Sequence, residues 1–309
     1  MILYRKVPFL TFVLNPYRKV KINLAGCNFN CKGCFAIAKE EVGRLFSVEN
    51  LLNLLIKSCQ FIYPVRSPSR IRDSSCLWRL TSNGVYGDIP PDVQMTGGEP
   101  TLNSDYLLTL IQGLRKLSVE KVGISTNGYL VDRNLVKELK SLGVNYIKLD
   151  LKAYSEKIHR WYTGESNRNV LKAVELLDEY GLNFYVRTIL MPGIVDFEEI
   201  ERIAKFLNQV NKNITYKIYQ FAPEQLDKKV SRSPTNKEMR KAYSIAKIYL
   251  DNVEFYTTET AYKPDPYKYI EVRADELLER FEQIDRISKS VINQWEMQYF
   301  RMNQILASR

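Results

Sequence analysis

Three cysteines lie close together near the start of the chain and could bind a metal cluster. They are Cys27, Cys31 and Cys34, with three residues between the first two and two between the last two. Three thiolates on one short loop can bind three irons of a 4Fe–4S cluster and leave the fourth iron open to a small molecule. Clusters that only transfer electrons normally use four cysteines. The spacing therefore indicates a cluster whose open iron takes part in chemistry.

A zinc knuckle is the alternative for this loop, because zinc sites also use cysteine pairs two residues apart. A structural zinc site needs four ligands, and the single histidine, His159, lies far away in the sequence. The spacing thus favours a cluster, although a cysteine pattern gains its meaning only together with other motifs.

A glycine-rich motif, Thr96–Pro100 (Thr-Gly-Gly-Glu-Pro), follows the cysteine loop and lies between a predicted strand and a predicted helix. Adjacent glycines, Gly97 and Gly98, let a ligand approach the backbone. Glu99 offers a carboxylate to a cationic amino group. A Gly-Gly pair often only makes a turn, so the motif is informative because it follows the cysteine loop.

Two charged residues, Asp150 and Lys152, come at the end of a predicted strand over Tyr146–Leu151. They share one face of that strand, because side chains alternate along it. A buried Asp or Lys needs a partner, which a zwitterionic ligand could supply; the alternative is an ion pair at the surface. Arg187, on the next predicted strand, is a candidate contact for a carboxylate or for the substrate, or else a snorkelling side chain.

Predicted strands and helices alternate over about two-thirds of the chain, which is the pattern of βα units around a parallel sheet. The predicted strands are Lys19–Leu24, Val93–Thr96, Lys121–Ser125, Tyr146–Leu151, Asn183–Leu190 and Thr215–Phe221. The predicted helices are Val48–Cys59, Asp105–Leu117, Arg133–Leu142, Asn167–Tyr180, Phe197–Val210 and Asn236–Leu250. Functional residues of such folds gather where strands end, and the motifs lie at such ends.

Together, the cysteine spacing and the Gly-Gly-Glu-Pro motif resemble the radical S-adenosylmethionine (SAM) superfamily. The resemblance implies an α/β fold with a partial (β/α)6 barrel, and a 4Fe–4S cluster and SAM as cofactors. It implies that the amino and carboxylate groups of SAM chelate the open iron. One electron then cleaves the sulfonium to a 5′-deoxyadenosyl radical, which abstracts hydrogen from a substrate. We therefore expect an oxidoreductase whose cofactor carries the chemistry and whose protein orients it.

Residues 17 to 225 resemble, more narrowly, the glycyl-radical-enzyme activases of the pyruvate formate-lyase activating type. The matching text is Leu149–Ala153, Ile158-His159, Gly164–Asn167, Val186–Gly193 and Asp196. The resemblance implies that Asp150 and Lys152 contact the methionine and ribose parts of SAM, and that the Thr126-Asn127-Gly128 turn also contacts the cofactor.

The resemblance and the residues together give one set of expected site residues. No catalytic residue is expected beyond them, because radical hydrogen abstraction requires no residue with a tuned pKa. The expected cluster ligands are Cys27, Cys31 and Cys34. The expected cofactor contacts are Phe35, Gly97, Gly98, Glu99, Pro100, Ser125, Thr126, Asn127, Asp150, Lys152 and Arg187.

Four departures separate the chain from the activases. Gly33 stands where the residue before the third cysteine is usually aromatic and touches the adenine, so either Phe35 substitutes or the adenine is held otherwise. Ser125 replaces an aspartate, which puts a monovalent cation site in doubt. Tyr219–Pro223 lacks the histidine that follows the sixth strand. Asn15–Lys19 replaces a Gly-Pro-Gly-Ile-Arg run. The departures leave the radical machinery intact and the substrate open.

Three functions follow for the chain. The first is an activase that makes a glycyl radical on a partner protein. The alternative is modification of a small molecule, nucleoside or tRNA, motivated by the missing run and by an arginine-rich loop. A non-catalytic iron–sulfur or zinc module would leave the glycine-rich motif and Asp150 with Lys152 unexplained. An electron donor such as ferredoxin or flavodoxin is an expected partner. Nucleic acid is not favoured, because the net charge of +10 comes without a long Lys/Arg block.

Three regions are expected. They are an N-terminal segment, 1–18; a core, 19–225, with a long basic insertion over 60–91; and a mainly helical extension, 226–309, in which apolar residues recur at helical spacing from Leu277 to Met302. Cys59 and Cys76 are not predicted to bind a second cluster. No apolar stretch approaches the roughly 20 residues of a membrane span, and the cysteine usage fits a reducing cytosol. We expect a cytoplasmic protein without a membrane partner.

Overall fold

The computed structural model describes residues 2–13, 19–62, 79–81, 84–86, 92–223, 230–258, 269–277 and 279 of the 309-residue chain. The chain divides into two compact units. Unit 1 consists of Met1–Gly26, Glu40–Gly123 and Pro264–Arg309, and unit 2 of Cys27–Lys39 and Ile124–Lys263. The glycine-rich motif thus belongs to unit 1 and the cysteine loop to unit 2.

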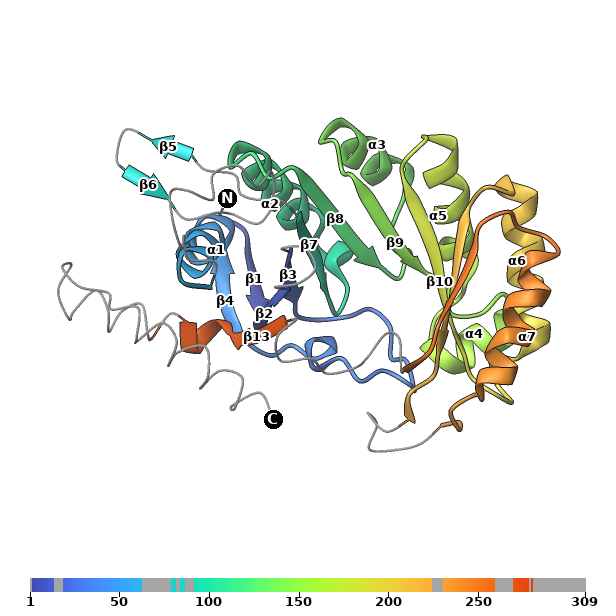
Figure 1. Ribbon diagram of the computed structural model, residues 1–309. Coiled ribbons are helices and arrows are strands. Elements are labelled where there is room, and N and C mark those ends of the chain that lie inside the picture. Colours follow the sequence, from blue (N-terminus) through green and yellow to red (C-terminus); the bar gives the residue numbers. More distant parts are fainter. Residues whose placement is uncertain are drawn as a thin grey trace, which may run out of the picture. The chain divides into compact units, whose positions relative to one another are not determined.

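Unit 1 is built on strands in the order β7-β3-β2-β13, of which β7 and β3 are parallel (Figure 1). Strand β2 is antiparallel to both β3 and β13. These strands span Asp92–Gly97 (β7), Lys19–Leu24 (β3), Phe9–Val13 (β2) and Tyr269–Arg273 (β13). Two small antiparallel sheets pair Tyr4–Val7 (β1) with Arg44–Ser47 (β4), and Arg79–Thr81 (β5) with Gly84–Tyr86 (β6). The helices are Val48–Ile62 (α1), Ser104–Lys116 (α2) and the 3₁₀ helix Pro100–Asn103 (η3).

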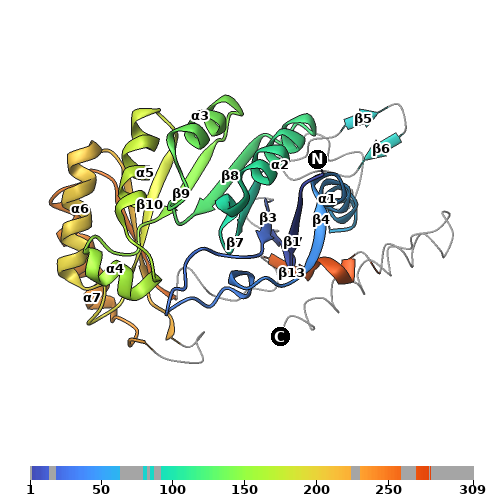
Figure 2. The same cartoon turned by 180° about the vertical axis from the view of Figure 1, so that it is seen from behind.

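Unit 2 holds five strands in the order β12-β11-β10-β9-β8, and the pairs from β9 to β12 are parallel. The strands span Lys121–Thr126 (β8, which begins in unit 1), Tyr146–Asp150 (β9), Phe184–Leu190 (β10), Thr215–Gln220 (β11) and Val253–Tyr256 (β12). The α-helices are Arg133–Ser141 (α3), Glu156–Thr163 (α4), Arg168–Glu179 (α5), Phe197–Asn211 (α6) and Asn236–Lys247 (α7), and Ile37–Lys39 forms a 3₁₀ helix (η1). Figure 2 shows α5 and α6 against the same side of these strands.

The strands of unit 2 carry a fully buried face and a half-buried polar face. Leu149, Val186 and Ile218 are completely buried, whereas Asp150 and Arg187, on the alternating positions of β9 and β10, are about three-quarters buried. Both faces of a parallel sheet are usually apolar and covered. The half-buried polar face therefore marks the side on which a site can form.

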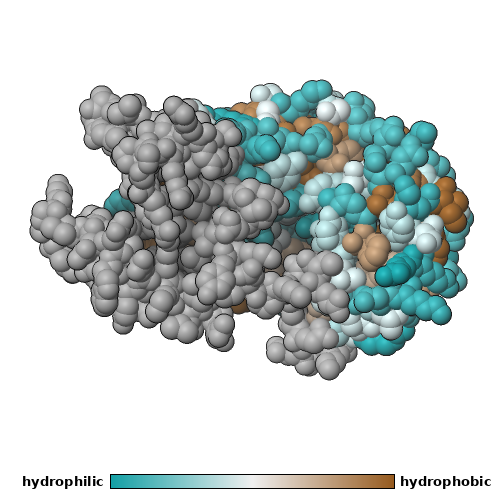
Figure 3. Space-filling view, viewed as in Figure 1, coloured by the Kyte–Doolittle hydropathy of each residue, from teal (hydrophilic) through white to brown (hydrophobic). Residues whose placement is uncertain are grey.

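The part of the surface that Figure 3 colours by hydropathy is mainly hydrophilic, with apolar residues between the polar ones. Such scattered apolar residues are normal for a folded protein. No helix of the described residues is long and apolar enough to cross a membrane.

All six predicted strands are confirmed, as β3, β7, β8, β9, β10 and β11, and all six predicted helices are confirmed, as α1, α2, α3, α5, α6 and α7. Seven strands, β1, β2, β4, β5, β6, β12 and β13, and the helix α4 were not predicted. Beyond residue 225 the structure adds two strands, β12 and β13, to helix α7. Residues 274–277 are helical; most of the predicted C-terminal helix, most of the 60–91 insertion and Cys76 lie outside the described residues.

Candidate functional site

The cysteine loop of unit 2 is fixed by the end of helix α4. The amide of Asn30 donates to the carbonyl oxygen of Thr163 at 2.8 Å, and that of Lys32 to the carbonyl of Tyr162 at 3.0 Å. The last carbonyls of a helix have no partner within the helix, so the loop satisfies them. Gly164 ends α4 in the left-handed region, at φ 89°. Helix α4 is therefore the platform on which the cysteine loop is built.

Phe29, between the first two cysteines, ties the loop to unit 2 through aromatic contacts. It is 6% exposed, and its ring packs edge-to-face against Tyr129 and against His159, each at a centroid distance of 5.6 Å. His159, far from the cysteines in sequence, thus lies next to their loop. Its Nδ1 lies 2.8 Å from the carbonyl oxygen of Glu165, and burial lowers the pKa of its ring. His159 is therefore a neutral residue that supports the loop.

Asn127, which is predicted to contact the cofactor, has its side-chain amide on the cysteine loop in the structure. Its Nδ2 donates to Asn28 Oδ1 at 2.8 Å and lies 3.9 Å from Cys27 Sγ. Its Oδ1 accepts from the amide of Tyr129 at 3.0 Å. The neighbouring Thr126 accepts from the amide of Gly128 and so closes the turn. This turn orients the first cysteine, a role that the sequence did not reveal.

The described cysteines form no disulfide, and the three loop cysteines are half-buried. Burial raises the pKa of the Cys31 thiol to about 12, although the nearby Lys152 lowers it. The thiol therefore keeps its proton until a metal replaces it. In the described part of the chain, no three His, Cys, Asp or Glu side chains are grouped to hold one metal ion. A 4Fe–4S cluster does not need such a group, because each thiolate binds a different iron, so three thiols on one loop fit a cluster.

Asp150, at the end of β9, forms one charged group with Lys152, two residues later, and with Arg187, which lies opposite Asp150 in the middle of β10. Arg187 Nε donates to Asp150 Oδ1 at 2.6 Å, and Lys152 Nζ donates to Asp150 Oδ2 at 3.1 Å. Burial would raise the pKa of Asp150, but the two cations outweigh it and lower that pKa. Burial would likewise lower the pKa of Lys152 and of Arg187, but Asp150 outweighs it and raises both.

One carboxylate and two cations leave a net charge of +1 in this group. The ammonium group of Lys152 lowers the pKa of Cys31. The positive charge of Lys152 therefore lies near the cysteine loop. The arrangement can accept the carboxylate of a ligand held next to the loop.

The glycine-rich motif of unit 1 also makes contacts within the protein. Gly97 has φ +112°, and a Cβ there would lie 2.5 Å from the backbone N and O of Leu24. The close approach of β3 thus explains this glycine. Glu99 is fully buried, and its Oε1 accepts from the amide of Thr101 at 3.0 Å and from its hydroxyl at 2.6 Å. Its carboxylate therefore caps helix η3, whose first residue is Pro100.

Arg5, on β1 in unit 1, is a structural residue that the sequence analysis missed. It is 6% exposed. Its guanidinium donates to the carbonyl oxygens of Ala25, Glu99 and Pro100 over 2.5 to 3.3 Å. Arg5 therefore joins the chain just after β3 to the chain just after β7. Nothing in the sequence around Arg5 distinguishes it from a surface arginine.

The remaining predicted contacts differ in exposure. Phe35 is 48% exposed, whereas Ser125 is 8% exposed. The structure thus gives Phe35 a surface position beyond the third cysteine and Ser125 a buried position on β8.

Comparisons with known proteins identify related sequences. A family model described as the Radical SAM superfamily matches residues 87–207. A Methanocaldococcus jannaschii protein that bears the name of a glycyl-radical enzyme activating enzyme is 31% identical over 239 residues, which cover 76% of this chain and 79% of the relative. A Thermoplasma volcanium protein named as a probable GTP 3′,8-cyclase is 28% identical over 250 residues, covering 78% of this chain and 68% of the relative.

Comparisons with solved structures show a shared fold. A radical SAM methyltransferase from Sphaerobacter thermophilus matches with a TM-score of 0.55 at 13% identity, over 77% of this chain and 66% of that one. Streptococcus suis SuiB bound to S-adenosylmethionine matches with a TM-score of 0.53 at 17% identity, over 75% of this chain and 48% of that one.

Proposed function

The chain belongs to the radical SAM superfamily, and from this premise we propose that it activates a glycyl-radical enzyme by taking a hydrogen atom from a glycine of that partner protein. Membership rests on the relative from M. jannaschii, which is 31% identical over most of both chains, and on the matching family model. The predicted fold class, an α/β partial barrel of the radical SAM type, is confirmed by the fold neighbours.

The cofactors of this superfamily are a 4Fe–4S cluster and SAM. When bound, they supply reductive cleavage of SAM: one electron enters, methionine leaves, and a hydrogen atom taken from the substrate ends in 5′-deoxyadenosine. The protein must bind both cofactors, exclude water and place the substrate hydrogen.

The residues of unit 2 that we assign to this task fall into two groups. Cys27, Cys31 and Cys34 bind three irons through their thiolates. Asp150 holds Lys152 and Arg187, whose surplus positive charge receives the carboxylate of SAM next to Cys31. The contacts predicted for Gly97, Gly98, Glu99 and Pro100 with the cofactor stay predictions.

One observation carries the choice of a protein substrate. The relative named as a glycyl-radical enzyme activating enzyme aligns over 79% of its own length, so the likeness extends well beyond the cysteine loop. The chemistry agrees with this choice, because abstraction of a glycyl hydrogen atom needs no general base. The only histidine, His159, is buried, and its pKa is lowered by that burial.

The test uses anaerobically reconstituted, reduced protein with SAM and the macromolecular fraction of a cell extract. We expect the fraction to stimulate 5′-deoxyadenosine formation and a protein in it to gain the electron paramagnetic resonance (EPR) signal of a glycyl radical. Cys31→Ala should abolish both signals. Cys59→Ala, which changes a buried cysteine on α1, is the matched control and should keep them. Stimulation without any protein radical would refute the activase assignment.

A second function, modification of a nucleotide or another small molecule, is favoured by one observation. The T. volcanium relative named as a GTP 3′,8-cyclase aligns over 78% of this chain. In this case the small-molecule fraction, and not the macromolecular one, stimulates 5′-deoxyadenosine formation. The same assay thus separates the two functions.

A further inference from the structure

Gly33, the residue before the third cysteine, lies where neighbouring side chains leave little room for a Cβ. Its φ is outside the left-handed region in which eight other glycines lie, so its backbone would accept any side chain. A Cβ at this position, however, would lie 3.2 Å from the hydroxyl oxygen of Tyr162 and 3.3 Å from Cε2 of Phe221. Both distances are tighter than ordinary van der Waals contact. The space that a side chain at position 33 would need is therefore already filled.

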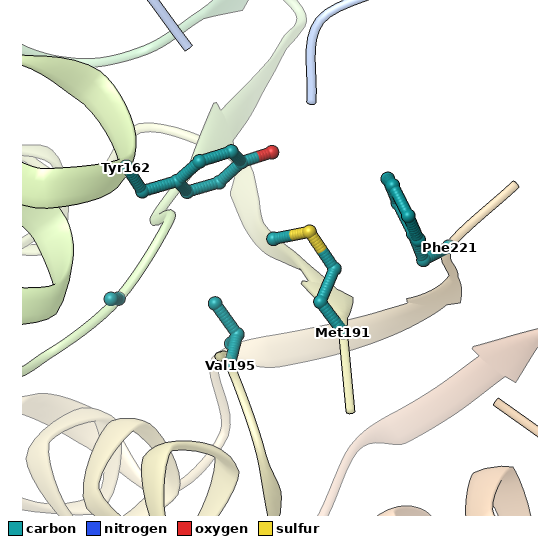
Figure 4. Close-up of a cluster of buried hydrophobic side chains, with 5 residues drawn as sticks. Tyr162, Met191, Val195 and Phe221 are labelled. Atoms are coloured by element: carbon teal, nitrogen blue, oxygen red, sulfur yellow. The ribbon is translucent and has the colours of Figure 1, made fainter. Parts of the chain in front are cut away.

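Tyr162, from the last turn of α4, is buried in that space. It is 2% exposed and packs in a buried cluster with Ala153, Met191, Val195 and Phe221. Figure 4 shows its ring above Met191, with the hydroxyl pointing toward the side on which Phe221 lies. Cys31 packs against the same cluster, so the tyrosine and the second cysteine share one environment.

The hydroxyl of Tyr162 is a hydrogen-bond donor close to the third cysteine, because its oxygen lies 3.2 Å from the position of a Cβ on the preceding Gly33. Burial raises the pKa of this hydroxyl. The hydroxyl therefore keeps its proton at neutral pH. The carbonyl of Tyr162 accepts from the amide of Lys32 at 3.0 Å, which fixes the loop and the tyrosine relative to each other.

We infer that Gly33 and Tyr162 are a matched pair, in which Tyr162 fills the side-chain space at position 33 and its hydroxyl donates one hydrogen bond to a sulfur atom of the cluster once that cluster is bound. Hydrogen bonds to cluster sulfurs are one of the factors that set a reduction potential. They stabilise the more negative, reduced cluster and so raise that potential. Tyr162 is thus a positioning residue for the cluster. This role depends on the proposed cluster, and it is the same whether the substrate is a protein or a small molecule.

The first test is the reduction potential of the reconstituted protein without SAM, measured by EPR-monitored redox titration. Tyr162→Phe keeps the ring and removes the hydroxyl, so we expect the same iron content and a more negative potential. A tenfold lower ratio of reduced to oxidised cluster at one fixed poise corresponds to about 59 mV. Tyr154→Phe, at a tyrosine one-third exposed before α4, is the matched control and should keep the wild-type potential. An unchanged potential in Tyr162→Phe would overturn the hydrogen bond.

The second test examines the shared space. Gly33→Phe should lower the iron content, because its ring collides with Tyr162. Gly33→Phe combined with Tyr162→Ala removes the closest of these contacts and should bind more iron than Gly33→Phe alone. Thermal unfolding of the apoproteins checks that each variant folds. Full iron content in Gly33→Phe, or no gain in the double variant, would overturn the pairing. Neither test uses a partner protein, so failure here is distinct from failure of the activase assignment.

Discussion

At the scale of single residues, Asp150 is the carboxylate on which the charged group of unit 2 depends. Asp150→Asn removes the carboxylate that Lys152 and Arg187 share. The side chains of Lys152 and Arg187 are 16% and 25% exposed. Removing one partner of a buried ion pair costs several kcal/mol, and partial exposure reduces this, so we expect a loss of about 1–3 kcal/mol in the free energy of unfolding. Urea denaturation at pH 7 measures it. Glu179→Gln, in a solvent-exposed pair with Arg133, is the control and should change stability little.

The same variant predicts a pH dependence. The pKa of Asp150 is lowered in the folded protein, so its stabilisation is fully present above the unfolded value of about 3.9. It is lost as the pH falls through the lower, folded pKa. The stability difference between wild type and Asp150→Asn should therefore be constant from pH 7 to about 5 and shrink on further acidification. A difference that grows below pH 4 contradicts the assignment.

The sequence predicted residues whose role follows from local spacing. The cysteine loop follows from spacing, and the shared face of Asp150 and Lys152 follows from strand alternation; the bond from Arg187 to Asp150 was not predicted. The contacts of Asn127 with Asn28, and of Arg5 with three carbonyls, join residues far apart in the chain. Such contacts exist only after folding, so no pattern around either residue could reveal them.

At the scale of elements, Arg5 ties β1 to the ends of β3 and β7. Arg5→Ala leaves buried carbonyls without donors, and we expect a loss of about 2–4 kcal/mol in the free energy of unfolding. Arg5→Lys keeps the charge but not the planar fork, so it should recover only part of the loss. Arg44→Ala, on the neighbouring strand β4 where the residue is exposed, is the control. Equal stability of Arg5→Ala and Arg44→Ala in urea denaturation would show that the hydrogen bonds of Arg5 do not stabilise the fold.

Two glycines end elements for different reasons, and alanine separates the reasons. Gly164 has φ +89°, and no atom lies within 4 Å of the position that a Cβ would take, so Gly164→Ala costs only backbone strain, about 1 kcal/mol. Gly97 has φ +112° and Leu24 backbone atoms at 2.5 Å from the same position, so Gly97→Ala should lose about 3 kcal/mol or more. Urea denaturation of both variants checks the order. A smaller loss at Gly97 than at Gly164 would contradict the packing of β3 against β7.

At the scale of the whole molecule, the order of strands and helices was predictable because each βα unit is local in sequence. The short strands were not. β13 pairs with β2, although most of the chain lies between them in the sequence. β1 pairs with β4, although β3 and the cysteine loop lie between them in the sequence. Pairing of this kind depends on tertiary contacts that a local pattern does not contain.

The central claim is that the three-cysteine loop binds a catalytic cluster that cleaves SAM. The most direct measurement is the 5′-deoxyadenosine yield, together with iron content, of anaerobically reconstituted and reduced protein, compared with Cys31→Ala and Cys59→Ala. We predict turnover and a full cluster in the wild type and in Cys59→Ala, and neither turnover nor a catalytic EPR signal in Cys31→Ala. Wild-type 5′-deoxyadenosine formation by Cys31→Ala would contradict the account.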